Sequence, residues 1–191
     1  MLIFTKMVSS KKDMVKEIEI PEGIVANIEN AVITIKKDSN EISKKIAPGV
    51  LITLEGNKVV LKTEKAGKSK RKNFGTMAGH IKNMIQGLTE GFEYELEICN
   101  VHFPMTVDFD KGTKIFKINN LLGEKYPRTV KLSDKVEIEI KAPKIIIKSY
   151  DIEAAGHTAS LLEATSKIRN RDRNKFQDGI FITKKPRMEY L

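Results

Sequence analysis

Residues 136–149, VEIEIKAPKIIIKS, align without gaps on an earlier segment of the same chain, VLITLEGNKVVLKT at residues 50–63. Both segments alternate apolar and polar side chains on either side of a short turn, which is typical of a β-hairpin. The shift between them is 86 residues (136 − 50 = 86), and four aligned pairs are identical: Val50 and Val136, Ile52 and Ile138, Lys58 and Lys144, and Lys62 and Lys148.

A helical segment follows each copy of the hairpin. After the first copy, apolar residues recur at spacings of three and four, with Gly87 and Gly91 at the carboxyl end: Phe74, Met77, Ile81, Met84, Ile85 and Leu88. After the second copy, the helix is expected to begin near Asp151, a favourable amino-terminal cap, and to place on one face Ile152, Ala155, Ala159 and Leu162. The same order of hairpin and helix in both halves indicates an internal duplication.

Shorter runs of period two surround these elements. Between residues 15 and 61 they are separated by turn-forming residues, and in the second half they cover 92–101, 103–109 and 114–119. The sequence therefore predicts an α+β protein of two duplicated small domains, each a mostly antiparallel sheet with a helix packed on one face. The expected parts are an N-terminal extension at 1–14, a first repeat at 15–98, a second repeat with a basic segment at 99–187, and a C-terminal tail at 188–191.

The positive charge of the chain is concentrated in two windows. The formal net charge is +9; residues 167–187 have eight basic and two acidic side chains (8 − 2 = +6), and residues 62–72 have six and one (6 − 1 = +5). The remaining residues therefore sum to 9 − 11 = −2. This distribution indicates a localised surface for a polyanion.

The first of these windows, KIRNRDRNKFQDGIFITKKPR at 167–187, is the main candidate site. Its arginines at 169, 171 and 173 alternate with Asn170 and Asp172, which fits neither a helical apolar stripe nor an amphipathic strand. Arginine is favoured where planar contacts to phosphates or base edges are made. The next residues predict a turn in which Gly179 adopts a positive φ while Phe176 and Ile180 anchor the segment to a core. A tethered basic loop could bind phosphates; a solvated, partly disordered tail is the alternative.

The sequence lacks the patterns of common catalytic and metal sites. Gly67-Lys68-Ser69 copies the end of a phosphate-binding loop, but Lys62 stands where that motif requires its first glycine. The three histidines are isolated from one another, and glutamates alternate with isoleucines as on the wet face of a sheet. We therefore expect a protein that is not an enzyme and has no cofactor and no metal.

Cysteine usage and hydropathy favour a cytosolic protein. The single cysteine, Cys99, excludes an internal disulfide and a multi-cysteine metal site, which fits a reducing compartment. No run reaches the roughly 18 apolar residues of a membrane span. The expectation is a soluble, cytoplasmic protein with no membrane partner.

Four motifs resemble one known family. GTMAGHIKNMIQGLTEGFEYEL, VHFPMTV, NNLLGEKYPR and ATSKIRNRDRNKFQDGIFI occur in this order and resemble the archaeal and eukaryotic branch of the large-subunit ribosomal protein L-six family, called L-nine in eukaryotes. The likeness runs from about Glu17 to Lys185, leaving residues 1–13 and the tail after Pro186 outside the family pattern. The resemblance implies two duplicated α+β domains, no enzymatic activity, and binding to large-subunit ribosomal RNA. It also implies that the C-terminal domain lies near the sarcin-ricin loop and the stalk base, where translational GTPases dock.

The resemblance places the RNA-facing segment at residues 169–179 and makes Gly123-Glu124-Lys125 a family motif that either contacts RNA or shapes the fold. Together with the charge pattern, it gives these expected RNA-binding residues: Lys167, Arg169, Asn170, Arg171, Arg173, Asn174, Lys175, Phe176, Gln177, Asp178, Gly179, Lys184, Lys185, Lys68, Lys70, Arg71, Lys72 and Lys125.

The expected partners are large-subunit ribosomal RNA and neighbouring ribosomal proteins, with translational GTPases nearby and no DNA. Basic loops on rigid sheets would neutralise phosphates and recognise folded RNA by shape. Two other readings stay open on the residues alone. One is a non-ribosomal RNA-binding adaptor or assembly factor, and the other is a protein-binding module whose acidic strands face a partner.

Overall fold

The computed structural model describes residues 13–186 and 188–189, and the chain divides into two compact units between Thr89 and Glu90. Most of the expected N-terminal extension and the last two residues of the expected tail therefore lie outside the described residues. The boundary expected after residue 98 lies later in the chain than the observed division. The reason is that the strand that follows Glu90 pairs on both of its edges with strands of the second unit.

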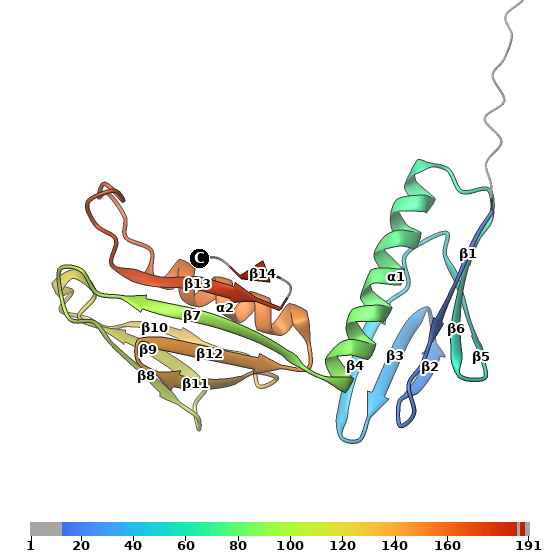
Figure 1. Ribbon diagram of the computed structural model, residues 1–191, viewed down its shortest axis with the longest axis horizontal. Coiled ribbons are helices and arrows are strands. Elements are labelled where there is room, and N and C mark those ends of the chain that lie inside the picture. Colours follow the sequence, from blue (N-terminus) through green and yellow to red (C-terminus); the bar gives the residue numbers. More distant parts are fainter. Residues whose placement is uncertain (1–12, 187, 190–191) are drawn as a thin grey trace, which may run out of the picture. The chain divides into compact units, whose positions relative to one another are not determined.

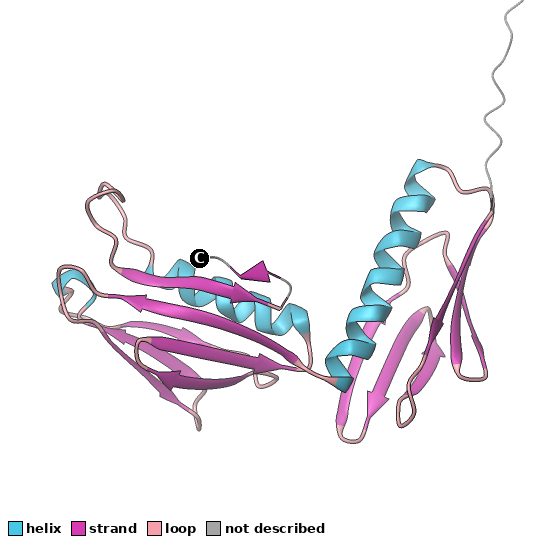
Figure 2. Ribbon diagram, viewed as in Figure 1, coloured by secondary structure: helices cyan, strands magenta, loops and turns pink. Residues whose placement is uncertain are grey.

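Within its described residues, 13–89, the first unit has one long helix and two three-stranded antiparallel sheets (Figures 1 and 2). The sheets have the orders β1-β6-β5 and β2-β3-β4. Helix α1 packs against strands of both sheets. The elements are β1 (Met14–Glu19), β2 (Val25–Glu29), β3 (Val32–Lys37), β4 (Asn40–Lys45), β5 (Leu51–Glu55), β6 (Lys58–Thr63) and α1 (Lys68–Thr89).

The second unit repeats this plan and extends it. Its three-stranded sheet has the order β10-β9-β8, and its larger sheet has the order β11-β12-β7-β13-β14. Helix α2 packs on β7, β12 and β13, so it covers one face of the larger sheet (Figure 1). The elements are β7 (Phe92–Cys99), β8 (Thr106–Asp110), β9 (Ile115–Asn119), the short 3-10 helix η1 (Leu121–Gly123), β10 (Arg128–Lys131), β11 (Glu137–Lys141), β12 (Lys144–Ser149), α2 (Ile152–Ser166), β13 (Gly179–Lys185) and β14 (Met188–Glu189).

The 86-residue repeat is visible in the bounds of the strands and in their bonds. Adding 86 to the bounds of β5 and β6 gives those of β11 and β12. The hydroxyl of Thr63 donates to the carbonyl of Gly49 at 2.7 Å, and Ser149, its equivalent, donates to Lys135 at 2.7 Å. The two lysines that are identical in the alignment at the start of β6 and β12 also pair equivalently, Lys58 with Glu17 at 3.1 Å and Lys144 with Glu95 at 3.2 Å. The predicted α+β fold of two duplicated domains is thus confirmed.

Both predicted helices are present, and their predicted apolar faces are buried except at Ile152, which is half-buried. Asp151 caps α2, since its carboxylate accepts a hydrogen bond from the Glu153 amide at 3.0 Å. Burying these apolar faces against the sheets is the main source of stability that the sequence pattern could specify. The buried residues include Phe74, Met77, Ile81, Met84, Ile85 and Leu88 of α1 and Ala155, Ala159 and Leu162 of α2.

Three features differ from the sequence-based expectation. Helix α1 begins at Lys68, one and a half turns before its first buried apolar residue Phe74, because lysine and arginine are good helix formers even without an apolar stripe. Strand β10 and η1 lie between the expected strand at 114–119 and the second hairpin, where the sequence predicted neither a strand nor a helix. Strand β7 ends at Cys99, and residues 101–103 form an exposed loop.

Candidate nucleic-acid interface

A loop of residues 167–178 connects α2 to β13, and both of its ends are fixed at Ser166. The Ser166 hydroxyl accepts the amide of Ile180 at 2.9 Å and lies 3.0 Å from the Glu163 carbonyl and 3.3 Å from the Ile180 carbonyl. Ser166 is 2% exposed and Ile180 is fully buried, so this junction belongs to the core. The basic loop is therefore an ordered surface loop with both ends held in the core, which argues against the alternative of a solvated tail.

Asp178 fastens the far end of the loop to the segment after β7. Its Oδ1 accepts the amides of Val101 and His102, both at 2.8 Å, and its Oδ2 lies 2.7 Å from His102 Nδ1. Burial alone would raise the pKa of this carboxyl, but the hydrogen bonds from the His102 amide and ring and from the Val101 amide outweigh it and lower the pKa to about 2. Asp178 is 4% exposed and already saturated with donors, so its part in the interface is to hold the loop.

Two aromatic rings carry two of the loop arginines. The guanidinium carbon of Arg171 lies 5.3 Å from the centre of the Phe176 ring, and that of Arg173 lies 5.3 Å from the Phe181 ring. The other neighbour of Phe176 is the imidazole of His102, stacked at 4.9 Å. Cation–π contacts restrict the long arginine side chains without neutralising them, so they stay available to an anion.

The loop backbone is shaped by its own polar residues. The Asp172 carboxylate accepts the Asn174 amide at 3.0 Å, and its carbonyl accepts the amides of Lys175 and Phe176. Gln177 donates to the Asn174 carbonyl at 3.0 Å, and Asn170 has a left-handed φ of 57°. These polar residues turn the chain tightly, which leaves Lys167, Arg169 and Lys175 exposed.

A bridge through Arg128 connects the loop to the turn before β10. Its guanidinium forms two hydrogen bonds with the Glu124 carboxylate and donates to the carbonyls of Thr165 at 2.7 Å and Lys167 at 2.9 Å. The hydrogen bond from Arg128 lowers the pKa of Glu124, so the carboxylate is held in its charged form. Glu124 therefore shapes the fold, while its neighbour Lys125 is exposed.

Two comparisons with known proteins agree on what this chain is. Residues 20–91 and 103–179 match the family described as Ribosomal protein L6, the same L-six family. The chain belongs to the ribosomal protein L6 family. This confirms the predicted family, and membership in a family of ribosomal proteins agrees with the expectation of a protein that is not an enzyme.

Archaeal relatives match nearly the whole chain. Each of the following is a large ribosomal subunit protein uL6. The protein of Methanobrevibacter smithii is 42% identical over 171 residues, covering 89% of this chain and 95% of its own length. That of Saccharolobus solfataricus is 40% identical over 176 residues, covering 91% and 96%. That of Methanocella arvoryzae is 36% identical over 174 residues, covering 91% and 98%.

The structure brings together only part of the residue set expected to bind RNA. The expected residues from Lys167 to Gln177 lie together in the loop of this L6-family chain, and Asp178 and Gly179 are buried at its far end. Lys184 instead pairs with Glu95 on the larger sheet at 3.1 Å, where the hydrogen bond from Lys184 helps to lower the pKa of Glu95. Lys185 lies beside it on β13 and is also half-buried.

The second group of expected residues lies in the first unit, on the amino-terminal turns of α1. Lys68, Lys70, Arg71 and Lys72 are all exposed. Two of them donate hydrogen bonds to the preceding segment, Lys70 to the Glu64 carbonyl at 3.0 Å and Arg71 to the Ala66 carbonyl at 3.1 Å. Because these basic side chains are in the amino-terminal turns, they stand at the positive end of the helix dipole, and the first turn of α1 has no acidic residue beside them.

Sequence reasoning missed the residues that support the loop. His102, Arg128 and Phe181 were not among the expected site residues, although each contacts the loop or carries one of its arginines. The repeated aromatic and basic pattern could have indicated Phe181. His102 and Arg128 are distant in sequence from the loop, so only the fold places them there.

The described part of the chain has neither a cluster of metal-binding side chains nor a helix suited to a membrane. No group of three or more His, Cys, Asp or Glu side chains within residues 13–186 and 188–189 could hold a metal ion. No helix in the same part of the chain is long and apolar enough to cross a membrane.

Proposed function

We propose that this L6-family chain is a structural constituent of the large ribosomal subunit in the cytoplasm, and that it binds large-subunit ribosomal RNA. The observation that carries the proposal is the basic loop at 167–178, which is pinned at Ser166 and Asp178 and presents two guanidinium groups on aromatic faces. Preformed arginines bind phosphates with little loss of side-chain entropy. The named relatives support the subunit, because each is a large ribosomal subunit protein.

The residues of the proposed RNA site fall into two classes. Lys167, Arg169, Arg171, Arg173 and Lys175 contact phosphates or stack on bases, while Asn170, Asn174, Phe176, Gln177, Asp178 and Gly179 give the loop its shape. Lys125 is exposed in the turn that Arg128 ties to the loop and contacts the same RNA. Lys68, Lys70, Arg71 and Lys72 form a second contact, with RNA or with a neighbouring ribosomal protein.

The resemblance to the family supports a position within the subunit. We propose that the second unit lies near the sarcin-ricin loop and the stalk base, where translational GTPases dock. The loop then serves as a rigid support for folded RNA, and the chain lies near the docking site of the GTPases.

RNA affinity as a function of salt tests the site. We expect the variant with Arg171→Ala and Arg173→Ala to bind a large-subunit RNA fragment more weakly at moderate salt, and the slope of log affinity against log salt to fall by about 2, because each phosphate contact contributes about 1. Lys131→Ala, an exposed lysine on β10, is the matched control and should bind as the wild type. An unchanged slope in the arginine variant would remove this loop from the RNA site.

Stoichiometry tests membership of the subunit. In a sucrose gradient of a lysate, a constituent should be present once per large subunit and should remain there in high salt. A substoichiometric pool that washes away would favour an RNA-binding adaptor or assembly factor instead.

A further inference from the structure

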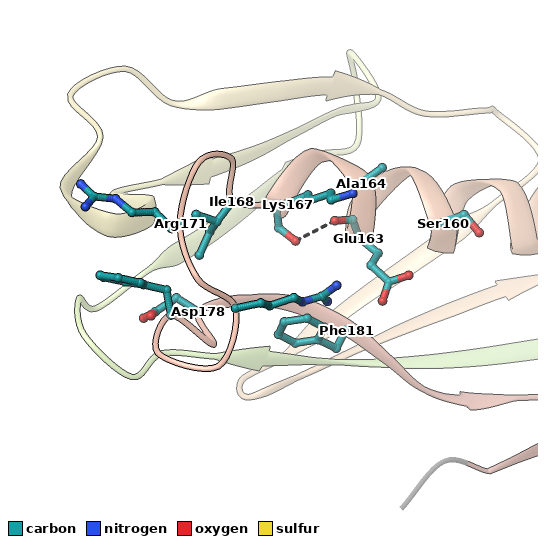
Figure 3. Close-up of a pocket in the computed structure, with 11 residues that line it drawn as sticks. Ser160, Glu163, Ala164, Lys167, Ile168, Arg171, Asp178 and Phe181 are labelled. Carbon is teal, nitrogen blue, oxygen red and sulfur yellow. Dashed lines mark hydrogen bonds between the residues drawn. The ribbon is translucent and has the colours of Figure 1, made fainter.

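A pocket of about 450 Å³ opens between the carboxyl half of α2 and the basic loop (Figure 3). Its apolar surface includes Ala164 and Ile168, and its aromatic surface is Phe176 and Phe181. The volume is in the range of pockets that hold small ligands. Phosphate binding by the exposed loop does not need such a pocket, so we ask which other ligand group the pocket would fit.

The lining of the pocket suits a flat, aromatic ligand. Arg171 and Arg173 line it together with the two rings that they cover at 5.3 Å each. Unpaired bases of RNA stack on aromatic rings and on guanidinium planes. The two guanidinium planes, held on their rings beside one cavity, therefore offer stacking surfaces for a nucleobase.

The lining of the pocket contains a carboxylate that no other described residue uses. Figure 3 shows the Glu163 side chain extending from α2 toward Phe181. Within residues 13–186 and 188–189, its carboxylate has no hydrogen-bond or ion-pair partner; only its carbonyl is used, by Ser166. The other carboxylate in the lining, Asp178, is fully occupied by residues 101 and 102. Glu163 is thus the acidic group available to a ligand.

We propose that this pocket receives one unpaired guanine nucleotide of the RNA, an inference that rests on the proposed function. Guanine alone places two adjacent N–H donors, N1–H and the 2-amino group, on its Watson–Crick edge, and a carboxylate accepts both. Adenine and cytosine offer one amino group there, and uracil offers one N–H between two carbonyls that a carboxylate repels. Lys167, also in the lining, offers a donor for the guanine O6.

The experiment is a titration of the full ¹⁵N-labelled chain with GMP, AMP, CMP and UMP, followed by NMR. All four carry the same phosphate, so phosphate binding contributes equally to each. We expect GMP to bind most tightly and to shift the amides of the pocket. IMP, which lacks only the 2-amino group, should bind roughly tenfold more weakly than GMP because one of its two bonds to Glu163 is absent. Equal affinities for GMP and IMP would overturn the proposal.

Glu163→Gln is the paired variant. It should weaken GMP binding roughly tenfold, remove the difference between GMP and IMP, and leave the salt dependence of RNA binding unchanged, because no phosphate contact is lost. If the wild type binds the RNA fragment yet shows no preference for GMP over IMP, the pocket assignment fails alone. If the wild type fails to bind the RNA at moderate salt as well, the proposed function fails too. The comparison of GMP with IMP on the wild type decides the question even if the variant does not fold.

Discussion

The imidazole of His102 joins a buried charge to an exposed one. Its Nδ1 lies 2.7 Å from Oδ2 of Asp178, and its ring stacks on Phe176 at 4.9 Å. Because an ionised carboxylate only accepts hydrogen bonds, Nδ1 carries the proton in this pair. Arg171 lies on Phe176 in turn, so a carboxylate, an imidazole, a phenyl ring and a guanidinium follow one another from the core to the surface. The position of the outermost cation therefore depends on Asp178.

This arrangement predicts an acid-sensitive second unit. The folded pKa of Asp178, about 2, is below its ordinary value of 3.8, so its contribution to stability is present above pH 3.8 and is lost as the pH falls toward 2. The loss amounts to about 2 kcal/mol. Asp178→Asn should be less stable than the wild type at neutral pH and should lack this part of the pH dependence.

Urea unfolding of the full chain at several pH values, followed by the NMR signals of residues 90–186, measures this effect. Asp134→Asn, an exposed loop position in the same unit, is the control and should keep the full acid sensitivity. The assignment of Asp178 would be wrong if its Asn variant lost stability below pH 4 as steeply as the wild type.

The repeated hairpin could be predicted because its determinants are local. Residues 50–63 and 136–149 each contain two alternating strands and a two-residue turn, so the periodicity alone specifies the pairing that the structure has. The apolar stripe from Phe74 to Leu88 specified the buried face of α1 in the same way. The start of that helix was harder to predict from the sequence, because Lys68 to Lys72 have helix propensity but no apolar periodicity.

The contacts that hold the basic loop in place could not be predicted, because they join residues far apart in the chain. His102 and Asp178 are separated by 76 residues, and Arg128 and Lys167 by 39. A composition of arginine and aromatic residues indicates a polyanion site, but the choice of partner for each side chain depends on the sheet order. The same limit applies to Asp178, which the sequence could not separate from the exposed loop residues beside it.

The hydrogen bonds of Arg128 predict that a positive charge alone at position 128 is not enough to stabilise the second unit and its loop. Arg128→Lys keeps the charge but loses the planar set of donors that reaches Glu124 and two carbonyls at once. We expect the second unit to lose about 1–2 kcal/mol of stability. RNA affinity should fall severalfold, because the first residue of the loop loses its anchor. Lys131→Gln on the same strand is the control, measured by urea unfolding and filter binding. Wild-type behaviour of Arg128→Lys would show that the bridge contributes only its charge.

The two equivalent hydroxyls give a prediction about the duplication itself. Thr63 and Ser149 are buried and each donates to a carbonyl 14 residues earlier. Thr63→Val and Ser149→Ala should each cost about 1 kcal/mol, because a part-buried hydrogen bond to the main chain is lost. The cost should be confined to the unit that carries the change, as followed by NMR signals in urea. Thr63→Ser retains the hydroxyl and should cost much less; a larger loss in Thr63→Ser than in Thr63→Val would mean that methyl packing, and not the hydrogen bond, stabilises this position.

Two helical glycines should respond in opposite directions to the same substitution. In α1, an added Cβ at Gly79 would meet no atom outside the helix within 4 Å, so Gly79→Ala should stabilise the first unit by about 0.5–1 kcal/mol through helix propensity. In α2, a Cβ at Gly156 would lie 2.9 Å from the hydroxyl of Tyr94, whose ring is buried against the helix. Relieving that overlap requires α2 to move off the sheet or Tyr94 to shift, and overpacking of this kind costs about 1–3 kcal/mol. Gly156→Ala should therefore be destabilising despite the gain in propensity. The double variant Gly156→Ala with Tyr94→Phe, which removes the hydroxyl, should recover most of the loss in thermal unfolding, because the contact that opposes the alanine is then absent.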